Sequence, residues 1–306
     1  MVSSLDNIKI YDCFMFFDET MLLELRLNLL NRYVDKFVIV ECAFNHRGQR
    51  KSFNFKINRF RKFKKKIIYI KVFKKPENLL KLKTKDNDND INSKNILNGY
   101  IWDNFQRNNI LQGLKKAKDE DIIIVSDIDE IPNLKNNDLK KIKEKIIFFK
   151  QKIFFYKFNL QYPKKYWFGS RACKKKFLIS PQWLRDIKAK KFHFWRIDTI
   201  FSKKKYLHTN FINNGGWHFT NIKSPDEIFK KLNSYAHWYE FNLNKLSKKN
   251  INNFFKRRLA IYNLDIDKTK SLSRFKAVIK LQKKSFKVLP DFIIENKKKY
   301  KKWLAN

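Results

Sequence analysis

Residues 121–132 read Asp121-Ile-Ile-Ile-Val-Ser-Asp127-Ile-Asp129-Glu130-Ile-Pro132. Four apolar residues of types that favour β-strands lead directly into three carboxylates and a proline. The pattern predicts a buried strand that brings acidic side chains to the edge of a sheet. Because side chains alternate along an extended chain, Asp127 and Asp129 are expected to point to the same side. Two such carboxylates can share a divalent cation, which in turn can bind a diphosphate.

Strand and helix patterns alternate in the chain before this stretch. Apolar runs predict strands at 8–17, 36–43 and 67–73, and apolar spacing predicts helices at 19–32 and 96–118. The alternation favours parallel strands joined by right-handed crossovers. Residues 84–95 are polar and aperiodic, which predicts a surface loop. We therefore expect residues 1–132 to form an α/β unit of nucleotide-binding type.

The chain after Pro132 gives a less regular pattern. We predict a helix at 136–145, a strand-rich segment at 146–162, and a helix that begins at Ser224 and Pro225 and ends near residue 241. Beyond residue 242 the composition shifts to lysine-rich helical stretches. The sequence thus predicts a main domain at 1–245 and a basic α-helical extension at 246–306.

The formal net charge of +40 over 306 residues first suggests an anionic partner. Nucleic acid is one alternative, but no nucleic-acid-binding motif is recognisable, and acidic side chains would repel phosphate without a metal. A peripheral contact of basic helices with an anionic membrane is another. Much of the charge is lysine spread among Asn, Ile and Phe, which also fits a general compositional bias. We expect no specific nucleic-acid partner, and the sequence does not indicate an oligomeric state.

The cysteines and the N-terminal residues bear on the cellular compartment. Cys13, Cys42 and Cys173 are odd in number and widely spaced, which predicts neither a disulfide framework nor a zinc site. No secretion signal and no membrane-spanning apolar stretch is recognisable. The expected location is the cytoplasm, with peripheral contact at a membrane surface as an option.

Several separated motifs together resemble one known family. They are Tyr11-Asp-Cys-Phe-Met-Phe-Phe-Asp-Glu19, Leu25-Arg26-Leu-Asn-Leu29, Val34-Asp35-Lys-Phe-Val-Ile-Val-Glu41, Gln106-Arg-Asn with Gly113-Leu114, Ser126-Asp-Ile-Asp-Glu-Ile-Pro132, Gly215-Gly-Trp-His-Phe219 and Ser234-Tyr-Ala-His237. In this order they resemble glycosyltransferase family 17, which includes the β-1,4-mannosyl-glycoprotein 4-β-N-acetylglucosaminyltransferases.

The resemblance implies a GT-A-type fold with a mostly parallel central sheet flanked by helices. It also implies a UDP-sugar donor, UDP-N-acetylglucosamine above all, a glycan acceptor, manganese or magnesium, and inversion by single displacement. The residues themselves already indicate the α/β class and the metal. Animal members carry an N-terminal membrane segment that is not recognisable here, so a glycoprotein in a secretory lumen is not the expected acceptor. A degenerate family member that only binds glycans is a further alternative.

Residue roles follow from the resemblance together with position. Asp127 and Asp129 are expected to hold the metal, with His218 as a third ligand, and Asp127 is also expected to contact the donor. Asp12 and Glu41, at the carboxyl ends of two predicted strands, are expected to contact uracil or ribose.

Further roles concern the phosphate, the sugar and the proton. Arg107 is expected to bind a phosphate, and Trp217 to stack on a sugar or, equally, to pack in the core. Glu130 is the first candidate for the catalytic base. His237 and Glu240, which lie three residues apart on one helix face, are the alternatives.

Overall fold

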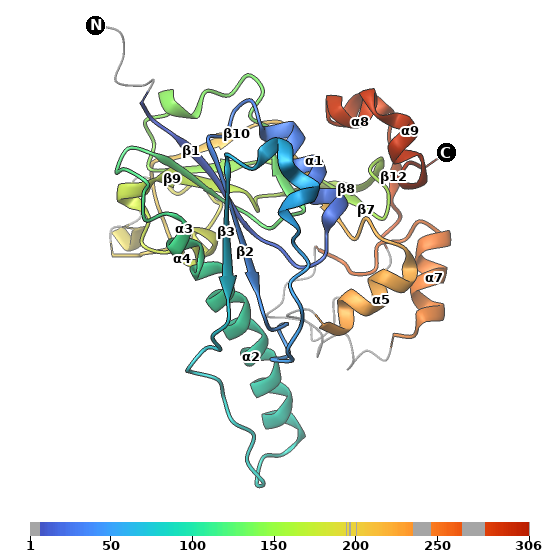
Figure 1. The fold of residues 1–306 in the computed structure, drawn as a ribbon. Coiled ribbons are helices and arrows are strands. Elements are labelled where there is room, and N and C mark those ends of the chain that lie inside the picture. Colours follow the sequence, from blue (N-terminus) through green and yellow to red (C-terminus); the bar gives the residue numbers. More distant parts are fainter. Residues whose placement is uncertain are drawn as a thin grey trace, which may run out of the picture.

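The computed structural model describes residues 7–193, 195, 197–199, 201–234, 246–264 and 279–305. Within these residues the centre is a seven-stranded sheet of order β10-β6-β9-β4-β1-β2-β3 (Figure 1). Its strands are β1 (Ile10–Met15), β2 (Lys36–Cys42), β3 (Ile67–Val72), β4 (Ile122–Val125), β6 (Ile146–Phe149), β9 (Arg171–Lys174) and β10 (Thr209–Ile212).

The strand pairing makes this sheet mixed. The strands β3, β2, β1 and β4 pair in parallel, and all three strands predicted in residues 1–73 are present. β10 is parallel to β6, but β9 runs antiparallel to both of its neighbours, β4 and β6. The four neighbouring parallel strands therefore bring their carboxyl ends to one edge of the sheet, where open α/β sheets bind ligands.

Both faces of the sheet are covered, which explains the continuous apolar strands. In β2, Phe37 and Ile39 belong to one buried cluster, whereas Val38 and Val40 belong to another on the opposite face. The same alternation divides the isoleucines of β4. Burial on both sides holds the end of β4, and so the acidic residues that follow it, at a fixed position.

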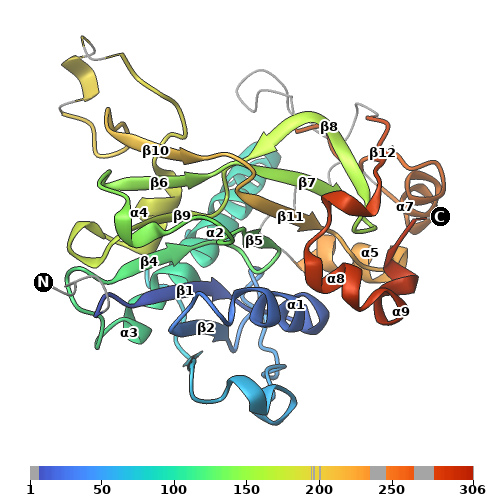
Figure 2. The same ribbon diagram turned by 90° about the horizontal axis from the view of Figure 1, so that it is seen from above.

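A second sheet, which the sequence did not predict as a separate element, lies beside the first. Its order in the described residues is β12-β8-β7-β11-β5 (Figure 2). The strands are β5 (Glu130–Pro132), β7 (Gln151–Phe155), β8 (Leu160–Trp167), β11 (Gly216–Thr220) and β12 (Gln282–Lys283). Because β5 directly follows the acidic loop after β4, this loop connects the two sheets.

Helices pack around both sheets. The α-helices are α1 (Thr20–Leu30), α2 (Asp88–Asn108), α3 (Ile110–Gly113), α4 (Pro181–Asp186), α5 (Pro225–Ser234), α7 (Lys248–Lys256), α8 (Asp291–Glu295) and α9 (Lys297–Tyr300). Short 3-10 helices cover Ile57–Phe63, Leu139–Lys141, Lys175–Phe177, Ile197–Thr199, Phe286–Val288 and Lys301–Trp303. The helix predicted at 136–145 is therefore only a single short turn.

The predicted loop at 84–95 was wrong for most of its length. α2 begins at Asp88, and Asn87 caps it: the Asn87 side chain accepts from the Asp90 amide, while the Asp90 carboxylate accepts from the Asn87 amide. This capping box and the acidic first turn stabilise a helix start that apolar periodicity does not reveal. The first half of α2 projects from the body (Figure 1).

The C-terminal residues pack into the main body. Leu289, Ile293 and Tyr300 belong to the same buried cluster as β1 and α1, and Ile251 and Ile261 pack on the second sheet. β12 also pairs with β8. The boundary expected at residue 245 lies outside the described residues, and the described residues after it pack against both sheets. In the part of the chain that the structure describes, no helix is both long and apolar enough to cross a membrane.

Candidate active site

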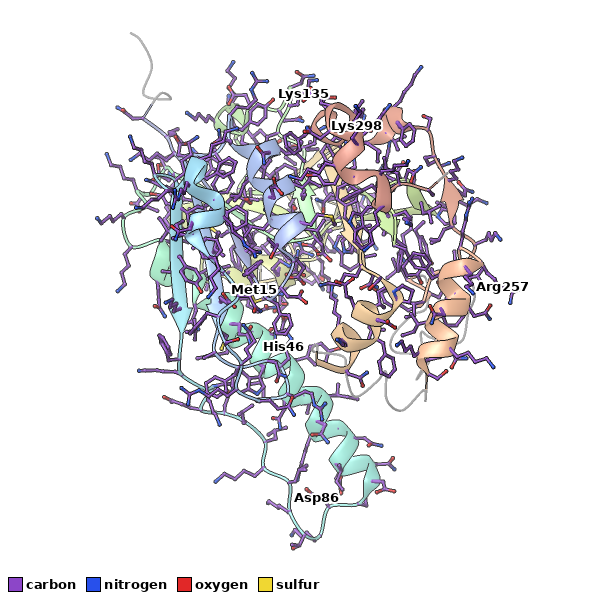
Figure 3. All side chains as sticks on the ribbon, turned by 45° about the vertical axis from the view of Figure 1, so that its right-hand side comes forward. Met15, His46, Asp86, Lys135, Arg257 and Lys298 are labelled. Atoms are coloured by element: carbon purple, nitrogen blue, oxygen red, sulfur yellow. The ribbon has the colours of Figure 1, made fainter. Side chains whose placement is uncertain are left out.

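The acidic loop between β4 and β5 lines two cavities that share Asp127, Asp129 and Lys231. The larger cavity, about 300 Å³, lies between α2, α4, β8, β11 and α5. The smaller, about 60 Å³, lies where the chain leaves β1 and β2. Met15 and His46 line it, at the end of the molecule from which α2 projects (Figure 3).

Arg26 of α1 binds the acidic loop between β4 and β5. Its guanidinium makes a buried two-point ion pair with Asp12 at 2.6 and 2.7 Å, and both side chains are fully buried. The same guanidinium donates to Ser126 Oγ and to the backbone carbonyls of Asp127 and Glu130. A single buried cation therefore satisfies the polar groups of a loop that has left its strand.

Two arginines hold Asp127. Arg107 of α2 donates to Oδ1 at 3.1 Å, and Arg185 of α4 donates to Oδ2 at 3.0 Å. Burial alone would raise the pKa of Asp127, but Arg185 and Arg107 outweigh it and hold this pKa below its usual value. Asp127 is thus a carboxylate anion held between two guanidinium groups.

Glu130 is fixed by a separate set of donors. Arg185 contacts both of its oxygens, at 2.5 and 3.0 Å, the Trp167 indole donates to Oε1, and the Asp127 amide donates to Oε2. Gly169 packs against the carboxylate, since a Cβ there would lie 2.1 Å from Glu130 Cδ. Only 1% of the Glu130 side chain is exposed. These contacts favour a role in holding the site together over the role of catalytic base.

Asp129 lies farther from its neighbouring nitrogen atoms than Asp127 and Glu130 do. His218 Nε2 lies 3.9 Å from Oδ1 and Lys231 Nζ lies 3.9 Å from Oδ2, both beyond hydrogen-bond distance. Burial raises the pKa of Asp129, and His218 and Lys231 offset this only in part. His218 stacks on Trp167, with 5.1 Å between ring centroids, and its buried Nδ1 has no hydrogen-bond partner among the described residues.

Trp217 and His218 are neighbours on β11 but face opposite sides. His218 faces the larger cavity, whereas the Trp217 indole donates to the Val288 carbonyl and packs against the main core. Strand alternation therefore removes Trp217 from the sugar-stacking role considered for it, and leaves core packing. Among the described residues, the aromatic side chains of Tyr100, Trp167 and Tyr262 line this cavity.

Asp12 and Glu41 lie at the expected strands but line neither of the two cavities. Asp12 is the buried partner of Arg26. The Glu41 carboxylate accepts from Lys51, from the Asn54 and Phe55 amides, and from the Tyr69 hydroxyl. Both carboxylates are fully buried and hydrogen-bonded, so they hold β1 and β2 to their neighbours instead of contacting uracil or ribose.

Two important cavity residues carry no recognisable sequence signal. Arg185 belongs to a six-residue helix that Ser180 caps, and Lys231 is one of 69 basic residues in the chain. Burial and the Asp127, Asp129 and Glu130 carboxylates distinguish both from surface cations, and these are visible only after folding. His237 and Glu240 lie outside the described residues.

The side chains around Asp129 bear on whether the expected metal ion fits this site. No group of three or more His, Cys, Asp or Glu side chains in the described ranges is arranged to hold a metal ion. Asp129 and His218 fit as two metal ligands whose side chains no described residue hydrogen-bonds, whereas Arg107 and Arg185 bind Asp127. Magnesium-type sites often use one or two carboxylates and complete the shell with substrate phosphates. Asp129 and His218 therefore fit a cation that the substrate helps to bind.

The charges that line the larger cavity also favour a bound cation. Its described lining carries the carboxylates of Asp103, Asp127, Asp129 and Glu130 against the cations of Arg107, Arg185 and Lys231. An anionic diphosphate entering this lining meets more acid than base. A divalent cation bound with it would reverse that balance.

The family model of glycosyltransferase family 17 matches residues 3–305. No curated protein matches the chain.

Proposed function

The chain belongs to glycosyltransferase family 17, and we propose that it transfers N-acetylglucosamine from UDP-N-acetylglucosamine to a glycan acceptor by single displacement with inversion. Manganese or magnesium assists the transfer in this proposal. The observation that supports it most is the pair of joined cavities at the edge of the sheet, with Asp129 between them. The proposed fold type is GT-A, supported by the parallel neighbours β3, β2, β1 and β4.

The donor nucleoside is assigned to the smaller cavity. Phe16 offers an apolar contact for a flat base, and Asn45, His46 and Gln106 offer polar groups that can hydrogen-bond to it. The cavity lies at the carboxyl ends of β1 and β2, where nucleotides bind in open α/β sheets. The diphosphate then reaches the shared Asp129, and the sugar and acceptor occupy the larger cavity.

The chain's own residues supply positioning and charge. Lys231 lines both cavities, and Asp129 raises its pKa despite the opposing effect of burial, so it stays an ammonium that can bind a phosphate oxygen. Asp129 and His218 would hold the divalent cation, which offsets negative charge on the departing diphosphate. Trp167, beside His218, offers its ring to a sugar.

No described residue is proposed as the catalytic base. Both Glu130 oxygens already accept hydrogen bonds from protein donors, so neither is free to contact an acceptor hydroxyl. His237 and Glu240 stay predictions from the sequence. Whichever group acts must reach the acceptor hydroxyl within hydrogen-bond distance in the larger cavity.

Donor binding is testable by thermal unfolding. UDP at about 100 times its Kd, with manganese present, is expected to stabilise the folded protein by about 2.7 kcal/mol. For a chain of this length that corresponds to a Tm increase of about 4 °C. The manganese-dependent part of the increase is expected to disappear when Asp127→Ala and Asp129→Ala are combined.

ADP serves as the matched ligand control, because it has the same diphosphate and a larger base. It is expected to give a smaller increase in Tm than UDP. An unchanged Tm for the wild-type protein with UDP and manganese would count against the proposed function.

A further inference from the structure

Arg107 and Arg185 approach Asp127 from two different helices, α2 and α4, and each donates to a different oxygen of the carboxylate. Two guanidinium groups converging on one anion at a cavity wall form the geometry that binds phosphate groups. We infer that Arg107 and Arg185 form a diphosphate-binding site, and that the Asp127 carboxylate occupies this site in the ligand-free protein. The inference rests on the proposed function for its ligand class, a nucleoside diphosphate.

The two carboxylates that Arg185 binds differ in how firmly they are held. Glu130 is 1% exposed and lies 2.5 Å from one Arg185 nitrogen, with Trp167 as a further donor. Asp127 is 22% exposed and lies 3.0 Å from the other nitrogen. A buried, short, multiply bonded pair is costly to break, whereas a longer pair at a cavity wall can exchange its anion. Glu130 is therefore the permanent partner of Arg185, and Asp127 is the exchangeable one.

Arg107 also has a second, lasting partner. It makes an ion pair with Asp103 one turn earlier in α2, at 2.8 Å, and donates to the side chain of Gln182. When Asp127 leaves, neither arginine loses its last acidic partner. Exchange of the Asp127 carboxylate for a phosphate oxygen therefore avoids leaving a buried guanidinium unpaired, which would be the main energetic cost.

The exchange of Asp127 for a phosphate group couples binding of the diphosphate to binding of the cation. Arg107 and Arg185 bind the Asp127 carboxylate, so Asp129 and His218 are the two neighbouring side chains that fit a metal ion. A diphosphate that takes over the two arginines releases the Asp127 carboxylate next to Asp129. The diphosphate and the divalent cation are then expected to increase each other's affinity by the same factor, as linkage requires.

The test measures pyrophosphate binding by calorimetry in EDTA, where no cation takes part. Asp127→Asn removes the competing anion and is expected to tighten pyrophosphate binding about tenfold relative to wild type. Asp129→Asn is the matched control, since it removes the same charge from the same lining without freeing an arginine, and it is expected to give a clearly smaller gain. Adding Arg185→Gln to Asp127→Asn should reverse the gain, and inorganic phosphate should bind more weakly than pyrophosphate.

Equal affinities for Asp127→Asn and Asp129→Asn, or weaker binding by Asp127→Asn, would overturn the inference. A second measurement needs no substitution: arginine side-chain NMR signals of the wild-type protein in EDTA. Pyrophosphate is expected to shift the signals of Arg107 and Arg185 and to leave those of Arg32, which lines neither cavity, unchanged; no shift at either cavity arginine would contradict the exchange. If the protein binds UDP with manganese yet fails this test, the inference fails and the proposed function stands.

Discussion

Asp129→Asn is expected to lower the manganese-dependent hydrolysis of UDP-N-acetylglucosamine at least about a hundredfold. Asp129 lines both cavities, and the His218 and Lys231 nitrogens lie 3.9 Å from its carboxylate oxygens, so the carboxylate is available to a bound cation. The amide keeps the shape of the side chain but loses the charge. Release of UDP under saturating donor, followed by chromatography, measures the effect.

Asp138→Asn provides the control for this variant. Asp138 is a half-exposed carboxylate that pairs only loosely, at 3.6 Å, with Lys141, and it lines neither of the two cavities at the acidic loop. Its substitution is expected to leave turnover unchanged. Wild-type turnover in Asp129→Asn would remove Asp129 from the proposed metal site.

Arg26→Met is expected to lower the free energy of unfolding by about 3–5 kcal/mol, because it leaves the buried Asp12 carboxylate unpaired. The substitution also removes the donor to Ser126 and to two loop carbonyls. Against a typical total stability of about 5–15 kcal/mol this is a large loss. Urea unfolding followed by circular dichroism measures it.

Two comparisons isolate the cause. Arg32→Met, which removes an exposed arginine near the end of the same helix, is expected to change stability by at most about 0.5 kcal/mol. Combining Arg26→Met with Asp12→Leu is expected to be less damaging than Arg26→Met alone, since no buried charge remains unpaired. A loss below about 1 kcal/mol for Arg26→Met would show that the ion pair does not hold the loop.

The sequence predicted the parts of the fold that depend on local pattern. The strands that became β1, β2 and β3 are mostly apolar, and β1 and β2 are buried on both faces, so their pattern is readable from the sequence. The second sheet was missed because its pairing joins segments far apart in the chain, such as β5 with β11. The start of α2 was missed because capping, with no apolar stripe, determines it.

The candidate site also contains residues that the sequence predicted and residues that it could not predict. The sequence placed Asp127, Asp129 and Glu130 at the end of a buried strand, and the structure has them there. It could not indicate that Arg185, 55 residues after Glu130, would lie against them. Nor could it separate His218 from Trp217, because the register of β11 against β7 and β5 decides which of the two faces the cavity.

The central claim, a metal-assisted transfer from a UDP-sugar, is tested most directly by a hydrolysis screen. The purified protein is incubated with UDP-N-acetylglucosamine, UDP-glucose and UDP-galactose, each with manganese and with EDTA, and UDP release is measured. Fastest release from UDP-N-acetylglucosamine, dependent on manganese, is the predicted result. Absence of UDP release from all three donors by the folded protein, or equal release in EDTA, would contradict the claim.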